Sequence, residues 1–162
     1  FSPDDVEKYR KELNIKEHND STIKEDFFEF LEERDYSLSY KMPFLLAVVK
    51  HMDAIGDAKI EEVLDDYIAF YQDRLSRGLQ VDRSTCPYDE KMLKDRKAVQ
   101  RNMLTNPFEK FERKRFLYYS KDLSVISMNH ALFGQMKAED WERVRRQMRE
   151  DLRKYYDEMG GV

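Results

Sequence analysis

RFLYYSKDLSVISM, residues 115–128, is the segment in which the apolar pattern of the chain changes from a helical to a strand-like period. Its first half, residues 115–120, is rich in the aromatic side chains that favour strands. Its second half, residues 123–128, alternates apolar and polar side chains, as a strand with one buried face does. Two strands around a short polar break predict a β-hairpin. Because Lys121-Asp122 is a poor turn dipeptide, we expect a connection longer than two residues.

Helical periodicity surrounds the hairpin on both sides. Upstream, Tyr40–Met52 is apolar almost all round, which predicts a central buried helix. Apolar residues at steps of three and four predict a long amphipathic helix over Ile60–Arg77 and a basic helix over Tyr88–Leu104. Downstream, the same spacing predicts a closing helix over Ala138–Met159. The sequence therefore predicts a mainly helical fold in which residues 115–128 form the only substantial β-structure.

The order of the elements narrows this expectation to a winged-helix-like core. Three helices followed by a hairpin is the order of a winged-helix unit, whose third helix enters the DNA major groove. A plain helical bundle with a hairpin flap is the alternative. Ser2 and Pro3 start a predicted N-terminal helix, and a capping box at Thr22 opens the next one. We therefore expect an N-terminal helix and linker over residues 1–20 and a single domain over 21–162.

The apolar pattern also predicts which side chains share the core. The buried helix and the amphipathic helix after it should pack on the closing helix. The residues expected to be buried together are Phe44, Leu45, Val48, Val63, Leu64, Tyr67 and Trp141.

Composition places the chain among globular proteins and excludes some classes. Charged residues make up 38% of the 162 residues, well above the usual value of about 25%. Ten Phe and ten Tyr provide a large aromatic core, which argues against disorder over the whole length. The single cysteine, Cys86, excludes an internal disulfide and fits a reducing compartment. No apolar run approaches the ~20 residues of a membrane span, so we expect a cytoplasmic protein without a membrane partner.

Charge is distributed unevenly along the chain. Residues 1–78 hold 11 Lys and Arg against 19 Asp and Glu, whereas residues 79–162 hold 18 against 14. Residues 90–115 alone hold nine basic and four acidic residues. Either the second half has a polar partner, or the two halves attract each other within one fold. For a nucleic-acid partner, the phosphate-binding candidates are Lys91, Lys94, Lys97, Arg101, Arg113, Lys114 and Arg115.

The sequence offers little catalytic chemistry. No Gly-rich phosphate loop is present, and the three histidines are scattered, so neither a cofactor nor a metal site is predicted. Cys86 lacks a base and an orienting group nearby in sequence, so we interpret it as a buried thiol. One alternative is a metal-dependent nuclease, since Glu112-Arg113-Lys114, with Asp95 upstream, fits a Glu-x-Lys element. Its position before the hairpin, outside a strand, disfavours that interpretation.

A family resemblance points in the same direction as the charge. The segments that carry it are YKMPFLL at residues 40–46, FYQDR at 70–74 and NPF at 106–108. They resemble the C-terminal accessory region of bacterial superfamily II (DEAD/DEAH-like) helicases and, more loosely, modules that precede HNH nuclease domains in restriction-type proteins. The resemblance covers about residues 36–135. It implies attachment to a motor that handles DNA or RNA, and it transfers no catalytic residue.

These observations lead to one expectation of function and two alternatives. The chain is expected to be a non-catalytic nucleic-acid-binding accessory module of a larger helicase-like or restriction/defence protein. Its partners would be nucleic acid and other domains of the parent chain. The first alternative is a protein-interaction or structural module that docks on the parent motor domain, and the second is the metal-dependent nuclease.

Overall fold

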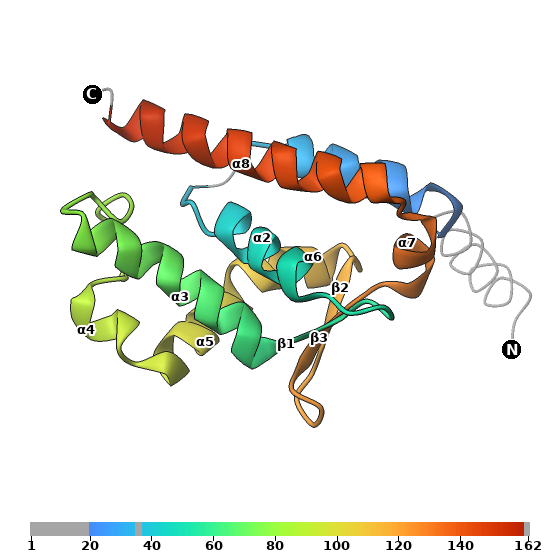
Figure 1. The fold of residues 1–162 in the computed structure, drawn as a ribbon, viewed down its shortest axis with the longest axis horizontal. Coiled ribbons are helices and arrows are strands. Elements are labelled where there is room, and N and C mark those ends of the chain that lie inside the picture. The colour runs from blue at the N-terminus through green and yellow to red at the C-terminus, as the bar shows by residue number, and fades with distance from the viewer. Residues whose placement is uncertain (1–19, 35–36, 161–162) are drawn as a thin grey trace, which may run out of the picture.

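The computed structural model describes residues 20–34 and 37–160 (Figure 1). The predicted N-terminal helix and linker therefore lie almost wholly outside the described residues. None of the described helices combines the length and apolar character needed to cross a membrane. After a first helix over residues 20–32, the elements are α2 (Lys41–His51), β1 (Asp57–Lys59), α3 (Ile60–Ser76), α4 (Glu90–Leu93), α5 (Arg96–Thr105), α6 (Pro107–Arg113), β2 (Leu117–Ser120), β3 (Val125–Met128), α7 (His130–Gln135) and α8 (Ala138–Gly160).

The fold is mainly helical with a β-hairpin, as predicted. Strands β2 and β3 pair antiparallel with Leu117 opposite Met128, and the turn between them is longer than two residues. Leu123 belongs to that turn and Arg115 precedes β2, so both predicted strands were drawn too long. The prediction did not include β1, a strand of three residues that pairs with the other edge of β3 and gives the order β1-β3-β2.

The third predicted helix is also corrected. Tyr88–Leu104 is not one helix, because Asp89 and Asp95 each act as an N-cap and divide it into α4 and α5. The Asp89 carboxylate accepts from Met92 N at 2.8 Å, and the Asp95 carboxylate accepts from Ala98 N at 3.2 Å. Pro107 then starts α6, which leads directly into the hairpin. The chain therefore reaches its hairpin through three short helices, α4, α5 and α6, instead of the single third helix that the winged-helix prediction requires.

The residues predicted to share the core are buried in the structure, with one exception. Six of the seven residues predicted to share it are fully buried: Phe44, Leu45, Val48, Val63, Leu64 and Tyr67. Trp141 is only half-buried and packs its ring against Phe133 of α7, with 6.1 Å between ring centroids. The reason is its place in the first turn of α8, next to α7, a helix that the sequence pattern did not predict.

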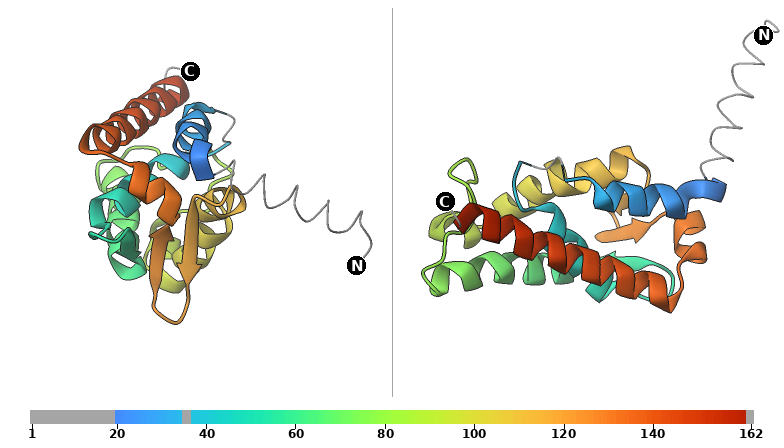
Figure 2. Two further views of the ribbon diagram at one scale, coloured as in Figure 1. Left: turned by 90° about the vertical axis from the view of Figure 1, so that its right-hand side faces the viewer. Right: turned by 90° about the horizontal axis from the view of Figure 1, so that it is seen from above.

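The helix over residues 20–32 and α8 lie side by side and cover one side of the core (Figure 2). Lys24 Nζ binds the Asp140 carboxylate at 3.0 Å, and Arg143 binds Glu32 at 3.3 Å. The Arg143 guanidinium also lies 4.0 Å from the centre of the Phe28 ring. These contacts join the acidic first half of the chain to the second half, as one of the two interpretations of the charge distribution expected.

Arg115 has an unusual backbone conformation at the start of the hairpin. Its φ of 64° lies in the left-handed region. Arg115 N donates to Glu112 O and Phe116 N donates to Phe111 O, both at 2.9 Å, which is the Schellman pattern at the end of α6. Helix α3 ends with the same pattern, but there Gly78 occupies the left-handed position, at φ 71°. The fold therefore places an arginine where glycine is the favoured residue.

Replacing Arg115 with Gly is expected to raise the free energy of unfolding by about 1 kcal/mol, because the left-handed backbone then carries no Cβ clash. The matched control is Gly78→Ala, which should lower it by a similar amount, since a Cβ there meets no atom within 4 Å and only the backbone conformation opposes it. Chemical denaturation measures both. A destabilised Arg115→Gly variant would show that contacts of the side chain outweigh the backbone cost.

Candidate nucleic-acid interface

The first group of predicted basic residues surrounds a hollow at the junction of α4 and α5. We call it the lysine hollow, and its volume is about 770 Å³. Its residues are Pro87, Asp89, Lys91, Met92, Lys94, Asp95, Arg96, Lys97 and Ala98. Its two carboxylates are the N-caps of α4 and α5, so they are occupied by backbone N–H groups. Four cations line the lysine hollow against these two carboxylates, and two of the four, Lys91 and Lys97, form no ion pair with another of the described residues, which favours an anionic ligand.

Arg96 fixes the orientation of α5 relative to α3. Its guanidinium binds the carboxylates of Glu61 and Asp65 on α3 at 2.8 and 2.9 Å, and the Glu61 carbonyl at 2.6 Å. Partial burial acts to lower the pKa of Arg96, but the hydrogen bonds to Glu61 and Asp65 outweigh it and raise the pKa. Arg96 thus anchors α5 on α3 and is not free to bind a ligand with its full charge.

The other cations of this region are exposed. Lys97 and Arg101 are four residues apart on α5, so they project from one face of the helix. Neither forms an ion pair with another side chain within residues 20–34 and 37–160, and the same holds for Lys91. Lys94 binds Glu90 at 3.3 Å in an exposed pair, which contributes little stability and is easily exchanged for a ligand.

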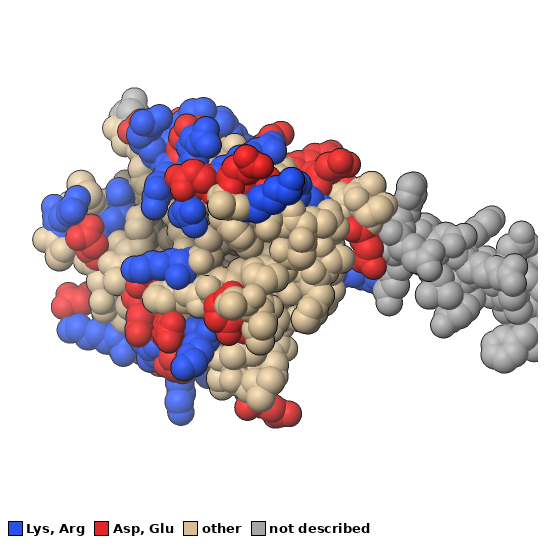
Figure 3. Space-filling view, turned by 45° about the vertical axis from the view of Figure 1, so that its right-hand side comes forward, with Lys and Arg blue, Asp and Glu red and all other residues tan. Residues whose placement is uncertain are grey.

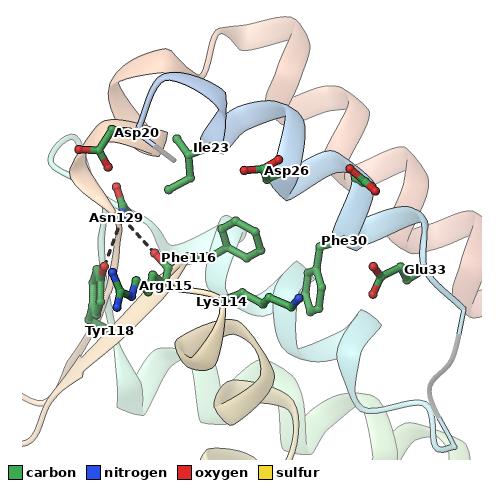
Figure 4. Close-up of a pocket in the computed structure, with 11 residues that line it drawn as sticks. Asp20, Ile23, Asp26, Phe30, Glu33, Lys114, Arg115, Phe116, Tyr118 and Asn129 are labelled. Carbon is green, nitrogen blue, oxygen red and sulfur yellow. Dashed lines mark hydrogen bonds between the residues drawn. The ribbon is translucent and has the colours of Figure 1, made fainter. Parts of the chain in front are cut away.

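The second group, Arg113, Lys114 and Arg115, lies elsewhere, at the end of α6. Arg113 binds Glu109 one turn earlier at 3.3 Å. Lys114 and Arg115 line a cleft of about 490 Å³ between the start of the hairpin and the helix over residues 20–32 (Figure 4). This cleft shares no lining residue with the lysine hollow. The structure therefore brings Lys91, Lys94 and Lys97 together and places Lys114 and Arg115 at a separate site.

The cleft beside Lys114 and Arg115 carries more negative than positive charge. Four carboxylates face the two cations, three from the helix over residues 20–32 and one from the residue directly after it: Asp20, Asp26, Glu29 and Glu33. Asn129 orients the basic side by donating to the Arg115 carbonyl at 3.0 Å and to the Tyr118 hydroxyl at 3.2 Å. Because like charges repel, these carboxylates oppose the approach of phosphates to Lys114 and Arg115.

The features considered for catalysis have structural roles. Glu112 lies in α6 and Lys114 is its C-cap, so the Glu-x-Lys triplet ends a helix, and Asp95 is occupied as the cap of α5. Within the described part of the chain, no three His, Cys, Asp or Glu side chains are grouped to hold a metal ion. Burial raises the pKa of Cys86, although hydrogen bonds from Tyr40 and a backbone group oppose it, so the thiolate is disfavoured.

Comparisons with protein-family models, curated proteins and solved structures found no match. The resemblance to helicase accessory regions therefore stays a prediction.

Sequence reasoning missed the buried polar residues Ser39, Lys41, Asp82 and Asp151, of which Asp82 lies in the loop between α3 and α4. The Asp82 carboxylate is 4% exposed and accepts from Ser39 N at 2.9 Å, Ser39 Oγ at 2.5 Å and Arg83 N at 2.7 Å. It also accepts from the Tyr155 hydroxyl of α8. Burial and the hydrogen bond to Asp82 raise the pKa of Tyr155, which keeps this hydroxyl a donor. We call Ser39, Asp82 and Tyr155 the Asp82 cluster.

Proposed function

We propose that this chain is a non-catalytic module that binds the phosphate backbone of nucleic acid through the lysine hollow and the neighbouring Arg101. The observation that carries the proposal is the group of exposed cations there, of which Lys91, Lys97 and Arg101 form no ion pair with another of the described residues. The net charge of −4 opposes avid binding, so we expect affinity in the range of about 10⁻⁴–10⁻⁶ M that non-specific phosphate contacts give.

The helicase-like or restriction/defence context belongs to the same proposal. A module of this affinity is useful when a larger protein already holds it near nucleic acid, because tethering raises its effective concentration. Together with the resemblance of residues 40–46, 70–74 and 106–108, this favours an accessory role within a parent protein.

Replacing Lys91, Lys97 and Arg101 together with Ala should weaken duplex DNA binding and flatten its salt dependence. Each phosphate contact contributes about 0.9 to the log–log salt slope, so the loss should approach about three units if all three side chains touch phosphates. Fluorescence anisotropy with a labelled duplex at several salt concentrations measures it. The fold should survive, because exposed charges contribute little stability.

The matched control is the triple Ala variant of Arg146, Arg153 and Lys154, which removes the same charge from exposed positions on α8. The proposal predicts a nearly unchanged slope for this control. A third variant, with Ala at Arg113, Lys114 and Arg115, should lose less slope than the first, because carboxylates surround that site. Equal slopes for the lysine-hollow variant and the control would reject the proposed surface.

A further inference from the structure

A groove runs between α8 and the pair of helices α2 and α3, and we call it the α8 groove. It encloses about 540 Å³. Its floor is apolar and comes from α2 and α3, with the side chains of Pro43, Leu46, Ala47, Val49, Ala69 and Phe70. Figure 3 shows this face, where a mostly uncharged recess lies below the charged side chains that cover α8. No residue that lines the α8 groove also lines the lysine hollow.

The rim of the α8 groove is basic. Arg145 and Arg149 stand one turn apart on α8, and Lys50 faces them from the end of α2. Arg149 is exposed and forms no ion pair with another of the described residues, while Arg145 binds Glu142 of its own helix at 3.1 Å. Of the three rim cations, Arg149 is therefore the one that forms no ion pair with another of the described residues, and the Glu142 partner of Arg145 does not line the groove.

Asp66 is the one carboxylate in the groove, and it is already bound. Lys50 Nζ and His51 Nε2 both lie 3.0 Å from its Oδ2 atom. Partial burial acts to raise the pKa of Asp66, but the hydrogen bonds from Lys50 and His51 outweigh it and lower the pKa. Asp66 thus holds Lys50 at the rim and leaves the two arginines without an opposing charge in the groove.

We propose that the α8 groove is a docking site for an acidic amphipathic helix of a partner protein. The apolar floor fits the apolar face of such a helix, as in helix-in-groove recognition, and the basic rim complements carboxylates on either side of that face. The phosphates of nucleic acid could bind the cations of the rim, but they would make no apolar contact with the six floor residues. The site is independent of the proposed phosphate-binding surface, so either can fail without the other.

A designed peptide of about four helical turns tests the site, with Leu at positions i, i+3, i+4 and i+7 and Glu on both flanks. Fluorescence anisotropy with the labelled peptide should show saturable binding to the full chain. Arg145→Glu with Arg149→Glu should weaken it at least about tenfold, because two rim contacts become repulsive. The matched control, Arg146→Glu with Arg153→Glu, has the same net charge and should change it less than about twofold, because neither residue lines the groove.

The variant Ala69→Glu tests whether the apolar floor contributes to peptide binding. Ala69 is exposed on α3, so the substitution leaves the fold intact, which thermal unfolding checks, and places a carboxylate on the floor. It should also weaken peptide binding about tenfold. Three outcomes would overturn the proposal: no binding to the wild-type chain, equal losses in both double variants, or loss of oligonucleotide binding in Arg145→Glu/Arg149→Glu while peptide binding is unchanged.

Discussion

Replacing Asp82 with Ala is expected to lower the free energy of unfolding by about 2–5 kcal/mol. The substitution removes the carboxylate that accepts from Ser39 N, the Ser39 hydroxyl and the Tyr155 hydroxyl, and a buried donor left unsatisfied costs about 1–3 kcal/mol. Asp82→Asn keeps the shape and one acceptor oxygen, so it should lose less. Urea denaturation of the three proteins measures the series.

Asp73→Ala is the matched control for Asp82. Asp73 is exposed on α3 and binds Arg77 one turn later at 3.2 Å, so its loss should change the free energy of unfolding by less than about 0.5 kcal/mol. If Asp82→Ala is as mild as this control, the carboxylate does not hold the loop, α2 and α8 together.

Leu45→Ala is the second substitution with a large expected effect. Leu45 is 0% exposed in the centre of α2, and truncating such a leucine leaves a cavity that costs about 2–5 kcal/mol. Leu123→Ala removes the same atoms from the hairpin turn, where the side chain is 73% exposed, and should cost less than about 0.5 kcal/mol. Calorimetry or denaturant unfolding of both variants checks the difference; a loss below about 0.5 kcal/mol for Leu45→Ala would contradict the core assignment.

The fold was predictable where one periodic pattern continued for several turns or strand positions. The elements α2, α3, α8 and the hairpin follow from such patterns. Strand β1 has three residues, Asp57, Ala58 and Lys59, which is too short for alternation to be recognised, and it exists because β3 offers a free edge. The break between α4 and α5 was missed because the side chains around Asp95 continue a helical pattern, and only its cap hydrogen bond reveals the new start.

The candidate site was predictable in its residue types and not in its grouping. Charge along residues 90–115 identified the cations, but which of them share a surface depends on packing between distant segments. Lys114 and Arg115 face carboxylates because the helix over residues 20–32 packs across the end of α6. The α8 groove was invisible in the sequence for the same reason, since its residues come from three helices and form a surface only after these have packed.

Because the helix over residues 20–32 pairs with α8, it can complete its packing only late in synthesis. The partners of Lys24 and Glu32 lie 116 and 111 positions later in the chain. As the ribosome adds residues from the N-terminus, the apolar side of the early helix emerges long before α8 exists to cover part of it. The entropy cost of closing a loop grows only slowly with the length of the loop. The long separation in sequence therefore does not prevent the early helix from pairing with α8 once α8 has been made. Until α8 has been made, Phe28 is an exposed apolar side chain on the nascent chain, and chaperones bind exposed apolar side chains.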